Sequence, residues 1–121
     1  MSVFTRDPKR EELKAIPLFA GLPREKLDLL VRTADVVEVP AGTRVIREGE
    51  PGHEFFAIAE GEVEISQAGQ AIGCEGAGDV FGEIALLHRV PRTATVTTTA
   101  PSRLWVLTDQ AFRSVLAGSF V

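Results

Sequence analysis

The 121-residue chain has one cysteine and two histidines, and its acidic residues outnumber its basic ones. Cys74 has no second cysteine with which to form an internal disulfide, and a single thiol cannot hold a Cys-ligated zinc ion or an iron–sulfur cluster. His53 and His88 are far apart and form no histidine cluster, and neither has a sequence relation to Cys74 that suggests a catalytic base. We therefore expect no catalytic residue, no metal and no cofactor.

Positive charge and long hydrophobic runs are scarce as well. A net charge of −4 argues against nucleic acid as the main partner, because binding to phosphate backbones needs a basic face. No apolar run approaches the length of a membrane-spanning helix, and residues 1–10 are too polar for a signal peptide. A lone thiol fits a reducing compartment, where we expect Cys74 to be a small buried hydrophobe. These features predict a cytoplasmic protein with no membrane segment.

The chain does contain the material for one folded domain, with 45% hydrophobic and 25% charged residues. Residues 6–15 are charged and mark the start of a short helix, and Pro23 suits the first position of another. The apolar residues of that second helix recur at helical spacing on one face: Leu27, Leu30, Val31 and Ala34. A last helix is expected over residues 109–117, capped by Thr108 or Asp109 and stopped by Gly118.

Between these helices the pattern changes to short strands rich in β-branched and aromatic residues. Strands are predicted over residues 36–39, 43–47, 55–59, 62–66, 92–98 and 103–107. The alternation in residues 62–66 turns Val63 and Ile65 inward and the carboxylates outward, and Trp105 is expected in the core. Many short strands separated by glycine-rich turns predict a mainly β domain, a double-sheet jelly roll or barrel with flanking helices.

Residues 81–96 concentrate the polar groups that can bind an anion. Gly82 opens a short apolar segment, and the first amides of a helical turn there would point outward as donors. Arg92 follows Pro91 and can present a guanidinium that binds two phosphate oxygens together. Glu83 would repel a phosphate, but it can accept a hydrogen bond from a sugar hydroxyl. Taken singly, each of these residues also fits an ordinary turn, first-turn or surface-strand position.

Three motifs carry a resemblance that covers residues 16 to 120. They are FGEIALL at 81–87 with PRTATV at 91–96, EGEPG at 48–52 followed by FFAI and EGEV, and LWVL at 104–107. This arrangement resembles the cyclic nucleotide-binding domain of protein kinase A regulatory subunits, cyclic nucleotide-gated channels and the catabolite activator protein. The resemblance implies a jelly roll with a phosphate-binding cassette at residues 81–96, N-terminal helices and a C-terminal helix.

The same resemblance implies a role for each cassette residue. Arg92 would pair with the exocyclic phosphate oxygen and the Ala85 amide would donate to the phosphate. Glu83 would accept from the ribose 2′-hydroxyl, Gly82 would allow close approach of the sugar, and Thr93 would lie where a hydroxyl can meet the 2-amino group of guanine. The nucleotide-binding residues implied in this way are Gly82, Glu83, Ile84, Ala85, Arg92 and Thr93.

We therefore expect a single cyclic nucleotide-binding domain over residues 1–121, with a helical segment at 1–34, a jelly roll at 35–108 and a helix at 109–118. The longer lid helix of the family is not expected in this chain. We expect the ligand to be cAMP in preference to cGMP. We expect its binding to be transmitted through the C-terminal helix to a protein partner or a fused domain. In this mechanism Ile84 and Leu87 repack and move Phe112 and Leu116. The alternative is a degenerate jelly roll that serves as a protein-interaction adaptor.

Overall fold

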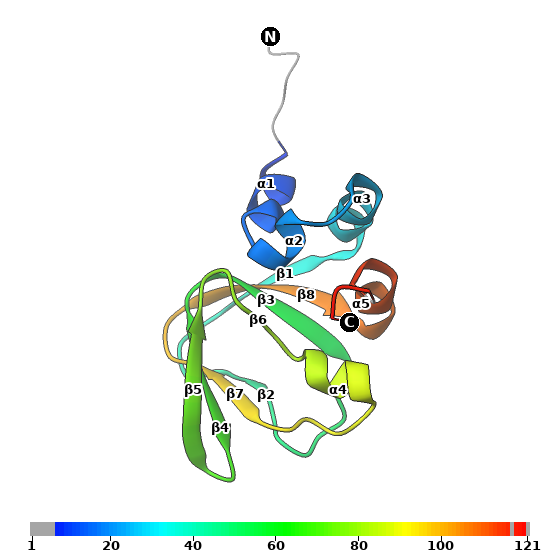
Figure 1. The fold of residues 1–121 in the computed structure, drawn as a ribbon. Coiled ribbons are helices and arrows are strands. Elements are labelled where there is room, and N and C mark those ends of the chain that lie inside the picture. The colour runs from blue at the N-terminus through cyan, green and yellow to red at the C-terminus, as the bar shows by residue number, and fades with distance from the viewer. Residues whose placement is uncertain (1–6, 117, 121) are drawn as a thin grey trace.

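The computed structural model describes residues 7–116 and 118–120, which form helices around a two-sheet barrel (Figure 1). The first three helices are α1 (Pro8–Lys14), α2 (Pro17–Ala20) and α3 (Arg24–Thr33). The Asp7 side chain caps α1 by accepting from the Lys9 amide, 3.1 Å away. Pro23 lies at the N-cap of α3, and Leu27, Leu30 and Ala34 are buried while Val31 is half-buried. The predicted packing face of this helix is thus largely confirmed.

Two four-stranded sheets follow, and every strand pair in the described residues is antiparallel. The first sheet has the order β1 (Asp35–Val39), β8 (Ser102–Thr108), β3 (Glu54–Glu60), β6 (Val80–Phe81). The second has the order β2 (Arg44–Ile46), β7 (Thr95–Thr98), β4 (Glu62–Gln67), β5 (Gln70–Gly76). Neighbours that are distant in the sequence make this the predicted jelly roll, mainly β with flanking helices.

The central strands of the first sheet, β3 and β8, have buried residues on both faces, so the molecule has two apolar cores. Alternate residues of β3 point to opposite faces: Phe55 packs against the helices, whereas Phe56 packs inside the barrel against Phe81. On β8, Trp105 joins the helix-covered core and Leu104 joins the barrel core. Trp105 is 6% exposed, as predicted, and it lies on the helix side of the sheet.

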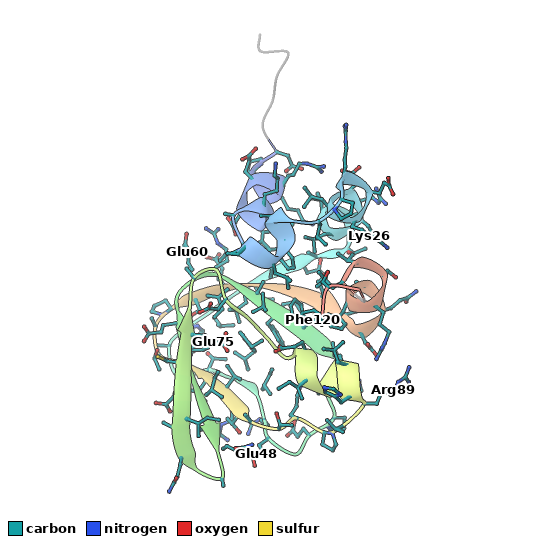
Figure 2. All side chains as sticks on the ribbon, in the orientation of Figure 1. Lys26, Glu48, Glu60, Glu75, Arg89 and Phe120 are labelled. Carbon is teal, nitrogen blue, oxygen red and sulfur yellow. The ribbon has the colours of Figure 1, made fainter. Side chains whose placement is uncertain are left out.

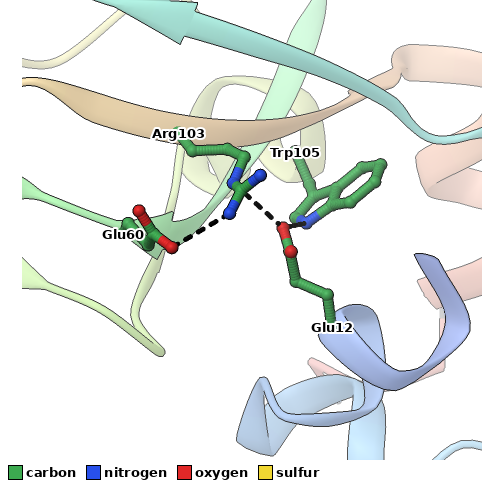
Figure 3. A network of polar contacts seen from close by, with 4 residues as sticks. All are labelled: Glu12, Glu60, Arg103 and Trp105. Atoms are coloured by element: carbon green, nitrogen blue, oxygen red, sulfur yellow. Dashed lines mark hydrogen bonds and ion pairs between the residues drawn. The ribbon is translucent and has the colours of Figure 1, made fainter. Parts of the chain in front are cut away.

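A polar network fastens α1 to the barrel beside Trp105 (Figure 3). The indole Nε1 of Trp105 donates to Glu12 Oε1 over 2.8 Å, which satisfies a buried donor. Arg103 lies 3.4 Å from the same Glu12 oxygen and donates to Glu60 of β3 over 2.9 Å. The network therefore joins α1, β8 and β3 on the helix-covered face.

The remaining helices are α4 (Glu83–His88), in the cassette, and α5 (Asp109–Leu116), which closes the described fold. Thr108 caps α5, because its Oγ1 accepts from the Ala111 amide over 3.1 Å. Ala117 lies outside the described residues, and Gly118 lies in a turn. In Figure 1, α5 and the N-terminal helices lie on one side of the first sheet and the β4–β5 hairpin lies on the other.

Four elements and one side chain differ from the expectations. The sequence did not predict α2, β5 or β6, and β7 begins at Thr95, so Arg92 and Thr93 precede the strand. The prediction that Cys74 is buried was wrong: Cys74 is exposed. Its register explains this, because Cys74 pairs with Glu64 on β4, whose side chain points outward.

In the part of the chain that the structure describes, no helix is long and apolar enough to cross a membrane.

Candidate functional site

A cavity lies beside the start of α4, inside the barrel. It brings together all six residues that the sequence analysis selected, three of which (Glu83, Ile84 and Ala85) are on α4. Its lining consists of Ile46, Ile65, Glu75, Phe81, Gly82, Glu83, Ile84, Ala85, Arg92, Thr93, Ala94 and Val96. Apolar side chains from both sheets form most of the wall, and the polar groups gather at α4, at the 92–94 segment and at one end of β5.

Arg92 lines this cavity, and its side chain is only 7% exposed. Its Nη1 donates to the Gly82 carbonyl over 2.9 Å and its Nη2 donates to the Glu54 carbonyl over 2.7 Å. Its own amide donates to the Glu50 carbonyl over 2.8 Å. Burial lowers the pKa of the guanidinium, and the nearby carboxylates of Glu54 and Glu83 oppose that effect. The result is a fixed buried cation whose fork-shaped donor array is already oriented.

Gly82 is the N-cap residue of α4. Its φ of 96° lies in the left-handed region, and a Cβ there would lie 3.1 Å from both Arg92 Nη1 and the Glu54 carbonyl oxygen. No side chain caps the first amides of α4. These amides and the Arg92 guanidinium therefore occur together at one end of the cavity, where they can act jointly on an anion.

Gly52 has no side chain, and the Arg92 side chain occupies the space where a Cβ of residue 52 would lie. A Cβ at residue 52 would lie 2.8 Å from the Ala85 Cβ and 2.8 Å from the Arg92 Cζ. Gly52 ends the EGEPG motif of residues 48–52, and this close packing is a structural reason for a glycine there.

Glu75 is a cavity residue that the sequence analysis missed. It lies on β5, where two glycines and a single β-branched residue give little strand signal. Burial, reinforced by the charges of Asp79 and Glu83, raises the pKa of Glu75 to about 7. Figure 2 labels this carboxyl on the β4–β5 hairpin. Only the register of β5, which is set by tertiary pairing, reveals that Glu75 belongs to the site.

The far side of α4 is connected to α5. Arg113 donates from Nη2 to the Leu86 carbonyl over 2.7 Å, and its Nε lies 2.8 Å from Asp109 Oδ1. A second hollow lies there, lined partly by Arg89 and Arg113, and Ala85 lines both cavities. Ile84 is 46% exposed, whereas Leu86 is buried in the core that holds α5 and Leu87 packs against that core.

Among residues 7–116 and 118–120, no group of three or more His, Cys, Asp or Glu side chains could hold a metal ion.

A two-sheet jelly roll with a cavity beside a short helix has the architecture of a ligand-binding domain. The chain belongs to the cyclic nucleotide-binding domain family, whose model matches residues 36–119.

The similar proteins include a protein kinase and regulatory parts of protein kinase A. The chain is 39% identical over 106 residues to the cGMP-dependent protein kinase egl-4 of Caenorhabditis briggsae, covering 88% of this chain and 14% of the kinase. The regulatory domain of Toxoplasma gondii PKA, solved with cAMP, superposes with a TM-score of 0.83 at 32% identity, over 93% of this chain and 47% of that one. The regulatory subunit of a cAMP-independent protein kinase A from Trypanosoma brucei gives 0.85 at 25% identity, over 93% and 44%. This chain therefore spans less than half of each of these proteins.

Proposed function

We propose that this chain is a cyclic nucleotide sensor that binds its ligand in the cavity beside α4 and does no chemistry of its own. The observation that carries the proposal is Arg92, a buried guanidinium held beside the uncapped start of α4. A fold alone gains little from burying such a charge, since removing an ion from water costs several kcal/mol.

Arg92 has donors to spare for a phosphate. Two of its five N–H groups reach backbone carbonyls within the described residues, and three remain to bind exocyclic oxygens. The Ala85 amide adds a further donor, and Gly82 leaves room for the sugar. Glu83 lines the cavity and would accept a hydrogen bond from the ribose 2′-hydroxyl. This contact would explain why a carboxylate lies beside the phosphate position.

The base is the finer part of the proposal. We take cAMP as the first candidate, because the similar regulatory domain from Toxoplasma gondii was solved with that nucleotide. cGMP is the second, because the similar kinase from Caenorhabditis briggsae is cGMP-dependent and Thr93 supplies an exposed hydroxyl at the cavity.

Ligand binding would be transmitted through α5 to a protein partner or a fused effector domain. Arg113 connects the C-terminal end of α4 to α5, and Leu86 packs in the same core as Phe112 and Leu116. A ligand can move this contact only through its different affinity for the two arrangements. A cytoplasmic location completes the proposal, and it is consistent with the free thiol of Cys74.

A second candidate function is a protein-interaction adaptor that has lost nucleotide binding. The observation that favours it is the likeness to a regulatory subunit described as cAMP-independent. The two candidates make opposite predictions for the effect of nucleotide on stability.

Thermal melting with saturating cAMP, cGMP and 5′-AMP separates them. A ligand that binds only the native state raises the midpoint, by an amount that corresponds to about 2.7 kcal/mol at one hundred times its dissociation constant. We expect a rise with a cyclic nucleotide and none with 5′-AMP. The same midpoint with all three would support the adaptor.

A further inference from the structure

The side chain of Glu75 lies on the inner face of the β4–β5 hairpin. Its partner in the register is Val63, which is fully buried, and cross-strand partners project from the same face of a sheet. The neighbouring pair, Glu64 and Cys74, projects outward, and both of these side chains are exposed. The inward carboxyl is therefore fixed by the strand pairing, and it lines the cavity.

Open space lies next to this carboxyl on the hairpin. The next inward pair on the hairpin is Ile65 and Gly73, and a Cβ added at Gly73 would meet nothing within 4 Å. Ile65 also lines the cavity. An apolar side chain beside a glycine with open space above it is a surface on which a planar ring can lie, with the Glu75 carboxyl at its edge.

Glu75 is the one charged group of this cavity for which the proposed function has no use. The cavity lining contains three charged side chains, of which Arg92 is assigned to phosphate and Glu83 to ribose. A cyclic nucleotide held at those two points has only its base left to meet the β4–β5 wall.

We propose that the Glu75 carboxyl contacts the hydrogen-bonding edge of the purine and sets the relative affinity for cAMP and cGMP. The inference rests on the proposed function, because it takes the phosphate and ribose positions from it.

The chemistry of the two bases makes this contact selective. Guanine presents two adjacent donors, N1–H and the 2-amino group, and an ionised carboxylate accepts from both. Adenine presents its 6-amino donor beside a ring-nitrogen acceptor, which matches a protonated carboxyl that donates with one oxygen and accepts with the other. The ionised form of Glu75 therefore favours cGMP and the protonated form favours cAMP.

Both forms of Glu75 occur near neutral pH, because its pKa is about 7. The groups around it explain this: Val63 of β4 is apolar, Asp79 of the following turn and Glu83 of α4 are negative, and Arg92 lies across the cavity. As pH rises through 7, the carboxyl loses its proton and the preference moves from cAMP toward cGMP.

The test is calorimetric titration of the whole chain with cAMP and with cGMP at pH 6 and pH 8, about one unit on either side of that pKa. For the wild-type chain we expect the ratio of cGMP to cAMP dissociation constants to fall about tenfold or more across this range. In Glu75→Gln the amide matches adenine at every pH, so the ratio should favour cAMP and lose its pH dependence. Any pH dependence of the nucleotides themselves would persist in this variant.

Glu64→Gln is the matched control, since it makes the same substitution on the outward face of the same hairpin, and it should behave as wild type. A wild-type ratio that does not change with pH, or a Glu75→Gln ratio equal to wild type at pH 8, would overturn the inference and leave the proposed function intact. Failure of the wild-type chain to bind either nucleotide would overturn both. The wild-type pH series decides the matter even if the variant does not fold.

Discussion

Arg92 and Gly52 are one structural unit. The guanidinium occupies space that exists only because residue 52 has no side chain, and it is fixed there by the Gly82 and Glu54 carbonyls. The buried charge therefore depends on the β2–β3 loop as much as on the cassette.

Gly52→Ala should weaken nucleotide binding and lower stability by about 1 to 3 kcal/mol, because its methyl group overlaps Arg92 and Ala85. Chemical denaturation and calorimetric titration measure the two effects. Gly21→Ala is the control, since a Cβ there meets nothing within 4 Å. Equal affinity and stability in the two variants would show that the space at Gly52 is not needed.

Glu75 should also affect stability. A carboxyl whose folded pKa lies above its usual value binds a proton in the folded state that the unfolded chain has released. Its contribution therefore decreases as pH rises from about 4.5 to about 7 and is constant above. Because the group is half-buried and screened by water, we expect Glu75→Gln to be more stable than wild type by about 1 kcal/mol at pH 8. Urea denaturation at pH 5 and pH 8 measures the difference, and a constant difference would contradict the raised pKa.

The α4 helix has only six residues, and its two ends contact different parts of the molecule. Its start contacts the Arg92 guanidinium, and the Leu86 carbonyl near its end accepts from Arg113 of α5. A shift of this short helix on ligand binding would therefore move α5 directly, through the hydrogen bond between Arg113 and the Leu86 carbonyl.

Arg113→Met keeps an aliphatic stem but removes the donor to Leu86, so it should reduce the response of α5 to ligand. Backbone amide chemical shifts of residues 109–116, recorded with and without cyclic nucleotide, measure that response. Loss of this partly buried hydrogen bond should also cost about 1 kcal/mol of stability. Asp109→Asn is the control, because it removes the ion pair and leaves the Arg113 bond to Leu86. Unchanged shifts in wild type would refute the coupling, and wild-type shifts in Arg113→Met would refute the role of Arg113.

The sequence was sufficient for the elements with strong local signals and for the cassette. Gly82, Glu83 and Arg92 are close in the chain, so their spacing anticipated that they meet. Glu75 could not be found that way, because its place depends on pairing with Val63 twelve positions earlier in a strand that has almost no strand signal. The error on Cys74 has the same origin: neighbours on a strand face opposite sides, and only the register decides which side is buried.

The molecule has two apolar cores, one beside the ligand cavity and one under the helices. The barrel core lies beside the ligand cavity, whereas the helix-covered core holds α1, α3 and α5 on the opposite face of the first sheet. The contact between Glu12 of α1 and Trp105 involves no residue of the cavity lining, so the docking of α1 can be weakened without removing a cavity contact.

Glu12→Ala should lower stability by about 1 to 2 kcal/mol, because it leaves the buried Trp105 Nε1 without its acceptor. Nucleotide affinity should be unchanged. Thermal melting and titration test the two statements, with Glu11→Ala, an exposed position on the same helix, as the control. A loss of affinity in Glu12→Ala would mean that the two cores are not independent.

The most direct test of the central claim is calorimetric titration of wild type, Arg92→Lys and Arg92→Ala with cAMP and cGMP, with the exposed Arg44→Ala as a charge-matched control. We predict that Arg92→Ala loses about 2 to 5 kcal/mol of binding free energy and that Arg92→Lys, despite its charge, is also much weaker, because one ammonium cannot reproduce the paired donors. Arg44→Ala should bind as wild type does. Unaltered nucleotide binding in Arg92→Ala would contradict the account.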